Sequence, residues 1–401
     1  MIFATYIKEK LEQSYKLLQK HKLDCWIIYS QGSDNLDPAL NFFNGGLKLR
    51  EEVLILIFKN FKIKIFTGEE NFSALKSLGY RAEEIYLLND LKVLLKTHLK
   101  EENVKTLALN KSERGYGSGI NHALYQKLLS NLNGLDLVIE EAGPLVYSLT
   151  LEQTPGEKRF NRELGFELLK VHGLITQNLG PGWTFKSLIS LLKENFQQAK
   201  LEFSEFFSND LFLSHGQLKR GFYNLADDPL FEPGYLLNLF LGLKNLNTHI
   251  FSARSWYILK PGETKVPQEL EQSFQKLQAL FNQLILTIQK EQDYNQVLIS
   301  LLEQIEDQPK QIIGIKYIGA QGHYTWTNSK PREADLKQIL DLKENQLFYL
   351  ELTLETQWGL LQQGETISIE GQESKFLIPP QKQIWAVQWF DDEQIREVID
   401  K

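Results

Sequence analysis

The sequence has very little sulfur, no long apolar run and no long run of one charge sign, and each absence excludes a class of protein. One cysteine, Cys25, among 401 residues cannot form an internal disulfide. No Cys-x-x-Cys motif or Cys/His cluster is present to bind zinc through sulfur. No apolar run reaches the roughly 18 residues that a membrane helix needs. We therefore expect a protein of the reducing cytoplasm, without a membrane span and without a bound cofactor.

The charge pattern excludes a further class. The chain has 51 acidic and 44 basic residues, spread along its length, for a formal net charge of -7. Nucleic-acid-binding domains carry a basic patch or stripe, which is missing here, so no nucleic-acid partner is expected. Residues 1–20 are amphipathic and charged, unlike a secretory signal. With 42% hydrophobic and 24% charged residues, the composition is that of a globular protein, and the length predicts two or three domains.

The first part of the chain alternates strand-like and helix-like segments. Residues 6–21 place apolar side chains at helical spacing, and residues 90–99 form a second amphipathic stretch. Short apolar runs typical of buried strands lie at 23–29, 53–58, 63–67 and 106–109. This alternation predicts an α/β domain over residues 1–147.

The pattern changes near residue 148. Thr154–Glu157 is typical of a helix start, with a capping threonine, proline at the first helical position and an acid in the first turn. That helix should end before Gly180, and a second should run from Thr184 to Gln198. Antiparallel strands are expected over 203–258, helices over 268–304 and strands again from Ile312 onward. Residues 148–401 are therefore predicted to be an α+β domain.

Three phrases in this order resemble the peptidase family that includes aminopeptidase P, prolidase, methionine aminopeptidase and creatinase. Asn41–Gly45 is similar to the "Y-L-T-G-F" phrase of its N-terminal domain, Thr154–Glu157 to its "S-P-x-E" helix start, and Pro181–Thr184 to its "P-G-x-T" turn. The resemblance implies a creatinase-like N-terminal domain, a "pita-bread" C-terminal domain around a curved sheet, and a homodimer. It also implies two divalent metal ions held by two aspartates, a histidine and two glutamates.

The aspartate positions of the resemblance carry other residues. In the best register Phe240 and Phe251 replace both aspartates at the expected spacing of eleven, with Arg254 matching the family's arginine. A phenyl ring cannot donate to a metal. A register shifted by two places Asn238 and His249 at the same spacing, and side chains two apart share a strand face. Both carboxylates are missing under either register.

The histidine positions are partly kept. The family's catalytic histidine falls on Tyr223, a poor base at neutral pH because a tyrosine pKa is about 10. The metal-binding histidine matches His323, but the glycines that follow it are replaced by Tyr324 and Trp326. The family's second histidine falls on Lys330.

Of the two family glutamates, the first has one match in this sequence and the second has several. Glu351 matches the first family glutamate. For the last one Glu365 is preferred to Glu370, and Gln363 also fits if the loop is shorter. His323 and Glu351 also have a plain interpretation as a hydrogen-bonded pair in a sheet, and the aromatic residues as core packing.

Three hypotheses follow. The first is a non-catalytic protein that binds a peptide, small molecule or protein partner, with metal-dependent peptidase activity absent. The second is a metal-independent hydrolase of a small C–N bonded substrate, as creatinase is in this fold. The third is a metallopeptidase with Asn238 and His249 as substitute ligands. Candidate catalytic residues are His323, Glu351 and Glu365, with Tyr223 and His249 weaker; expected pocket-lining residues are Asn238, Phe240, Phe251, Arg254, Tyr324 and Trp326; no metal ligand set is expected.

Overall fold

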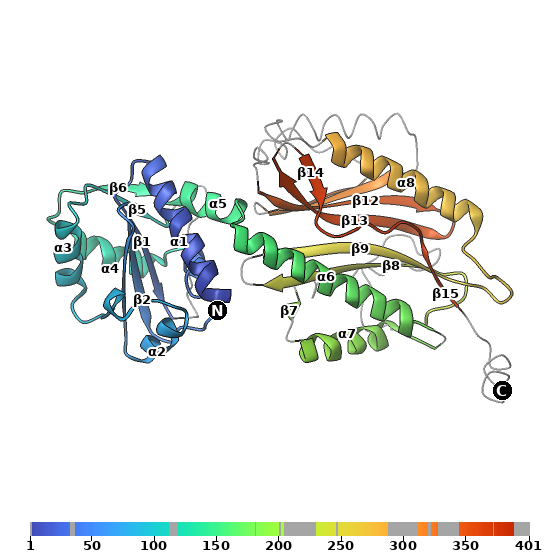
Figure 1. The fold of residues 1–401 in the computed structure, drawn as a ribbon, viewed down its shortest axis with the longest axis horizontal. Helices are drawn as coiled ribbons and strands as arrows, with labels where there is room; N and C mark the ends of the chain where they lie inside the picture. Colours follow the sequence, from blue (N-terminus) through green and yellow to red (C-terminus); the bar gives the residue numbers. More distant parts are fainter. Residues whose placement is uncertain are drawn as a thin grey trace. The chain divides into compact units, whose positions relative to one another are not determined.

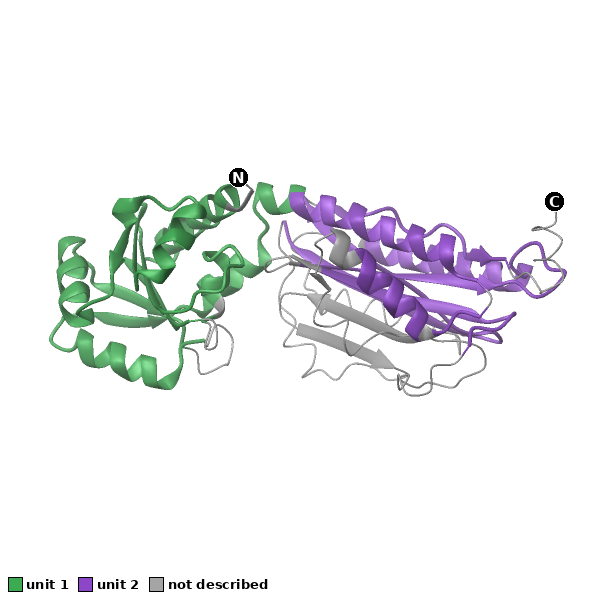
Figure 2. Cartoon of the chain, turned by 90° about the horizontal axis from the view of Figure 1, so that it is seen from below, with its two compact units in different colours: residues 1–159 green, residues 160–401 purple. Residues whose placement is uncertain are grey.

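The computed structural model divides into two compact units, which are considered one at a time. They comprise residues 1–159 and 160–401 (Figure 2), and the domain boundary expected at 147 stays a prediction. The structure describes residues 2–32, 37–111, 119–180, 182–199, 202–203, 230–245, 248–287, 312–319, 322–327, 345–371 and 373–388.

The N-terminal unit is built on a six-stranded sheet in the order β4-β3-β2-β1-β5-β6 (Figure 1). β1 pairs with β2 in antiparallel and with β5 in parallel, and β5 pairs in parallel with β6. The strands are β1 (Cys25–Gln31), β2 (Glu52–Phe58), β3 (Lys62–Thr67), β4 (Ile85–Leu87), β5 (Thr106–Leu109) and β6 (Val138–Glu141). All four strands expected in this region are confirmed, and the mixed sheet confirms the α/β class.

Helices cover this sheet because each carries an apolar stripe. Leucines at helical spacing on α3 and α4 pack against one face of β1, β2 and β5. The helices are α1 (Ile2–Lys20), α2 (Glu70–Ser77), α3 (Leu91–Glu101), α4 (His122–Leu132) and α5 (Gly143–Leu151), with short 3-10 turns at Pro38–Phe42 and Ala82–Glu84. The helices expected at 6–21 and 90–99 are thus confirmed as α1 and α3.

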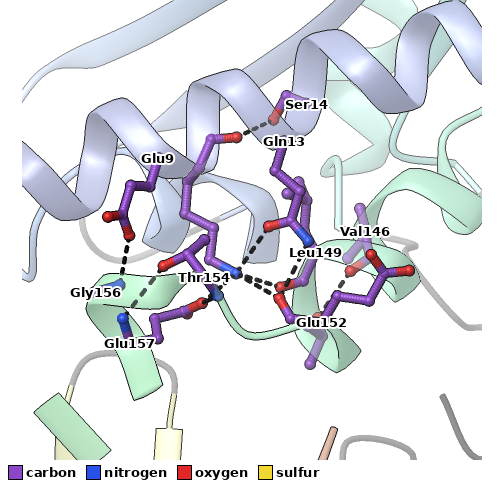
Figure 3. A network of polar contacts seen from close by, with 11 residues as sticks. Glu9, Gln13, Ser14, Val146, Leu149, Glu152, Thr154, Gly156 and Glu157 are labelled. Atoms are coloured by element: carbon purple, nitrogen blue, oxygen red, sulfur yellow. Dashed lines mark hydrogen bonds and ion pairs between the residues drawn. The ribbon is translucent and has the colours of Figure 1, made fainter. Parts of the chain in front are cut away.

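A buried polar network ties α1 to the start of α6 (Pro155–Asn178). Thr154 and Glu157 form a capping box, because the Glu157 N–H donates to Thr154 Oγ1 at 3.2 Å and the Thr154 N–H donates to Glu157 Oε2 at 2.7 Å. Lys10 Nζ lies 2.9 Å from Glu157 Oε2 and donates to the Leu149 carbonyl at 2.7 Å. Figure 3 shows Leu149, Thr154 and Glu157 within this network. The expected helix start at Thr154 is confirmed, and its acid has a second role as the partner of a buried lysine.

The C-terminal unit contains a large, mainly antiparallel sheet in the order β11-β10-β12-β13-β9-β8-β7, with β14 on β13 and β15 on β9. Its elements are α6, α7 (Phe185–Ala199), β7 (Glu202–Phe203), β8 (Leu236–Asn245), β9 (Thr248–Ile258), α8 (Gln268–Thr287), β10 (Ile312–Gly319), β11 (Gly322–Thr327), β12 (Leu347–Thr356), β13 (Gly359–Glu370), β14 (Glu373–Phe376) and β15 (Trp385–Val387). The α+β class is confirmed; the expected segments at 204–229 and 288–304 lie outside the described residues.

The described helices of this unit cover one face of β8 and one face of β12, and the strand pairing through β9 and β13 places these two faces on the same side of the sheet. α6 and α7 cover Leu237, Leu239 and Leu241 of β8, and α8 covers Leu350 and Leu352 of β12. We call this the helix-covered face. The opposite face, which bears Asn238, Phe240, Phe251, Tyr349 and Glu351, we call the inner face. Among the described helices, none combines the length and the apolar character required to cross a membrane.

Candidate functional site

Three aromatic side chains pack together on the inner face. The rings of Phe240 and Phe251 stack with centroids 5.3 Å apart, and Tyr349 meets them edge-on at 5.2 and 5.6 Å. All three are almost fully buried. Strand geometry explains the contact, because the ladder pairs Phe240 with Ala253 and Phe251 with Gly242, only two positions away along β8. The site therefore has an apolar, close-packed centre.

Tyr349 also occupies the space above Gly364 on β13. Gly364 lies opposite Glu351 on one side and Ala253 on the other. A Cβ atom added at Gly364 would lie within 2.6 Å of the Tyr349 ring carbon Cζ and 3.0 Å from the Glu351 Cβ. Only glycine fits at this position as long as the tyrosine ring keeps its place.

The retained glutamate holds this tyrosine. The Tyr349 hydroxyl donates a short hydrogen bond to Glu351 Oε2, and both side chains are buried. Burial, reinforced by the charge of Glu351, raises the pKa of Tyr349 well above its ordinary value. Tyr349 therefore stays protonated as a donor, and the Glu351 carboxylate has a fixed acceptor role.

Glu365 and Arg254 lie on the other face of the sheet. The ladder pairs Glu365 with Leu350 and with Ser252, both on the helix-covered face. There Glu365 forms an ion pair with Arg254, and both side chains are about 1% exposed or less. The expectation that these two line the pocket with Glu351 does not match this geometry. A shift of one residue along a strand moves a side chain to the opposite face, and Gly364, not Glu365, lies opposite Glu351.

The alternative pair, Asn238 and His249, is not brought together. The ladder pairs Asn238 with Ser255, and it pairs His249 with Lys244. Lys244 lies six residues after Asn238 on β8, so the two candidates are separated by about 20 Å along the strand. Asn238 is fully buried and makes a closed network: its amide donates to the Leu360 carbonyl, and its oxygen accepts from the Ser255 hydroxyl. Of the two registers, the one through Phe240 and Phe251 gives a contiguous cluster.

The remaining candidates are placed by backbone alone or not at all. His323 pairs with Ile318 of β10, which pairs with Tyr349, so the register puts His323 in line with the aromatic cluster. Tyr324 and Trp326 fall in line with the helix-covered positions of β12. The side chains of these three residues, and the whole of Tyr223, lie outside the described part of the structure.

These residues do not fit a two-metal centre. Phe240, Phe251 and Gly364 offer no donor atom, and the carboxylate of Glu351 is engaged by Tyr349. Two adjacent divalent ions need bridging carboxylates to offset their repulsion. Within the described part of the chain, no group of three or more histidine, cysteine, aspartate or glutamate side chains is placed to hold a metal ion.

The architecture has clear counterparts among solved structures. An X-Pro aminopeptidase from Thermotoga maritima MSB8 matches with a TM-score of 0.67 at 16% identity, over 93% of this chain and 99% of its own. An Xaa-Pro dipeptidase from Bacillus anthracis matches with 0.67 at 14% identity, over 95% and 99%. A prolidase from Pyrococcus horikoshii OT3 matches with 0.62 at 14% identity, over 93% and 99%. This chain has the prolidase fold. In sequence, no family model and no curated protein matches it.

The prolidase fold confirms the resemblance at the level of architecture, over both domains. Identities of 14–16% show the fold alone, so activity has to be argued from the residues on it.

Sequence reasoning missed a buried histidine behind the site. His172 of α6 is fully buried, and its Nε2 lies 2.6 Å from the Ser252 hydroxyl oxygen. Burial, with a smaller effect from the charge of Arg254, lowers the pKa of His172 well below its ordinary value. His172 therefore stays neutral on the helix-covered face. Its place on the apolar stripe of α6, four residues after Leu168 and three before Ile175, was the signal that could have found it.

Proposed function

We propose that the chain is a non-catalytic relative of the Xaa-Pro peptidases, and that its C-terminal unit binds a peptide or protein partner without cleaving it. The observation that carries this proposal is the packing of Phe240, Phe251 and Tyr349 over Gly364 on the inner face. Aromatic rings fill the position at which the family resemblance calls for metal-bridging carboxylates. A site of this kind favours apolar contact over water activation.

The missing metal-binding carboxylates are accompanied by compatible residues at neighbouring positions. Gly364 leaves room for the Tyr349 ring, and Glu351 accepts the hydrogen bond of its hydroxyl. Each change is consistent with the next, which is the pattern of a repacked interior and not of isolated damage. This mutual fit supports a folded protein maintained for a purpose other than metal chemistry.

The metal-independent hydrolase receives less support. Among its proposed residues, Glu365 is paired with Arg254 on the helix-covered face, away from Glu351. Among the candidates whose strand pairing the structure describes, Glu351 and His323 alone lie near one another in register, and Glu351 is already hydrogen-bonded to Tyr349. Acid–base catalysis needs both groups within reach of one substrate.

Metal analysis and a peptidase assay test the proposal together. The purified protein is incubated with Mn²⁺ or Co²⁺, dialysed, and analysed for metal content, and hydrolysis of Xaa-Pro dipeptides is followed beside an active prolidase. We expect less than stoichiometric metal and no hydrolysis above the protein-free rate. Stoichiometric metal, or hydrolysis that disappears in Glu351→Gln, would overturn the proposal.

The expectations of a homodimer and of a cytoplasmic location join this proposal. The single cysteine, Cys25, is a free, buried thiol, as suits a reducing compartment. Sedimentation equilibrium at several protein concentrations would measure the oligomeric state, and a purely monomeric protein would remove the dimer from the proposal.

A further inference from the structure

β6 (Val138–Glu141) is the edge strand of the N-terminal sheet (Figure 1). Among the described strands it pairs with β5 alone, in parallel, from Thr106 opposite Val138 to Leu109 opposite Glu141. An edge strand presents backbone groups that another extended chain can bind.

The side chains of β6 are exposed on both of its faces. Val138 is 56% exposed and Ile139 40% exposed, and Glu140 and Glu141 are exposed as well. Because side chains alternate along a strand, Val138 shares one face with Glu140, and Ile139 shares the other with Glu141. Each face of the edge therefore carries one exposed apolar and one exposed acidic side chain.

The N–H and C=O groups of alternate residues of β6, Ile139 and Glu141, are directed away from β5. The N–H of Val138 donates to the Lys105 carbonyl at 2.8 Å, and the N–H of Ala142 donates to the Leu109 carbonyl at 2.7 Å. In a parallel ladder alternate residues bond to the same neighbour, so the N–H and C=O of Ile139 point to the outer edge. Ile139 is thus the residue through which an added strand would first bind.

We propose that β6 is a docking strand for an extended peptide segment that carries basic side chains next to apolar ones. The charged residues between 133 and 142 are Asp136, Glu140 and Glu141, all acidic. An added strand with lysine or arginine opposite the two glutamates and apolar residues opposite Val138 and Ile139 complements both features of the edge.

A second copy of the same strand complements the edge poorly. Two antiparallel copies of β6 place glutamates opposite glutamates or opposite Val138 and Ile139, depending on register. Like charges directly opposite one another destabilise a strand pair. The charge pattern therefore favours a basic segment of another protein over self-association.

The test uses the full-length protein and capped synthetic peptides. One peptide has the core Lys-Lys-Val-Val, one the reversed core Val-Val-Lys-Lys, and one the acidic core Glu-Glu-Val-Val; binding is measured by fluorescence anisotropy at low and high salt. We expect one of the two basic peptides to bind at least tenfold more tightly than the acidic one, with weaker binding at high salt.

Two variants of Ile139 separate strand addition from simple charge attraction. Ile139→Pro removes the outward N–H and leaves the bonds to β5 in place, whereas Ile139→Thr keeps that N–H. We expect the proline variant to bind the basic peptide roughly tenfold more weakly than the threonine variant. Equal binding by the two variants would overturn strand addition, provided that circular dichroism shows both to be folded.

A charge reversal gives a second measurement. Glu140→Lys/Glu141→Lys should exchange the preference, so that the acidic peptide binds more tightly than the basic ones. An unchanged preference, or a protein that self-associates through this edge and loses that association in Ile139→Pro, would refute the proposed partner. Because β6 lies in the N-terminal unit, these outcomes are independent of the metal and peptidase assays on the C-terminal unit.

Discussion

A buried carboxyl group in the N-terminal unit should make that unit less stable as the pH rises through the weakly acidic range. Asp37 is about 1% exposed. Its Oδ1 accepts from Asn110 Nδ2 at 2.5 Å and from the Ala39 N–H at 3.0 Å, and its Oδ2 is buried with no hydrogen-bond partner among the described residues. Burial raises the pKa of Asp37 to about 7 against the opposing effect of these hydrogen bonds.

The sign and size of the effect follow from linkage. Below pH 4 Asp37 is protonated in both folded and unfolded states, and the full stability is present. Between about pH 4 and pH 7 the unfolded chain releases the proton while the folded one keeps it, so stability falls as pH rises, and above pH 7 it levels off. A shift of roughly three pKa units corresponds to about 4 kcal/mol at most.

Asp37→Asn should remove most of this slope. The amide oxygen still accepts from Asn110 and from the Ala39 N–H, but the side chain no longer titrates. Urea unfolding at each pH, read by hydrogen-exchange protection of the β1 amides, gives the difference between the wild type and the variant. A difference that stays constant from pH 4 to pH 8 would refute the reasoning.

Asp24→Asn is the matched control. Although partial burial opposes it, hydrogen bonds from Lys59 and from backbone N–H groups lower the pKa of Asp24 to about 2. Its contribution is therefore present above its ordinary pKa and is lost as pH falls toward 2. Replacing Asp24 should leave the slope between pH 4 and pH 7 as it is in the wild type.

Three further changes test the packing. Lys10→Met leaves the carboxylate of Glu157 buried without its cation and should lower the free energy of unfolding by about 3–5 kcal/mol. The double variant Lys10→Met/Glu157→Met should lose less stability than the single variant, and chemical denaturation measures both. Gly364→Ala should lower the free energy of unfolding by about 1–3 kcal/mol. In a Tyr349→Ser background, where the space is open, the same change should cost much less, and thermal unfolding of the four proteins of the double-mutant cycle measures this non-additivity. Phe240→Ala should cost about 3–5 kcal/mol in calorimetry, and a cost under 1 kcal/mol would mean that the aromatic cluster is not close-packed.

Much of the fold could be predicted because local and long-range signals agree. Residues 25–29 of the run that became β1 carry no charged or amide side chain that would mark an exposed face, so the run was predicted to be a buried strand. The helix start at Thr154 has its capping residue, proline and acid in order, and α6 begins there. The role of Glu157 as partner of Lys10 could not be predicted, because the two are far apart in the sequence.

The candidate site was harder to predict because it depends on strand register. Glu365 and Gly364 are neighbours in the sequence, but only Gly364 lies opposite Glu351 on the inner face. Spacing along one strand does not show which of two adjacent residues has its side chain on the inner face of the sheet. The distinction rests on the pairing of β13 with β12 and β9, which is non-local.

The same alternation explains how the two faces of one sheet can carry different chemistry while the sheet is kept. Along β13 the helix-covered positions hold Leu361, Glu365 and Ile367, buried against helices or paired with Arg254, and these interactions hold the layers together. Gly364, at an inner position of the same strand, faces away from these helices, so a change there leaves these interactions in place. Glycine at position 364 requires only that Tyr349 fill the space that it leaves, and the fold is then retained on a face with different chemistry.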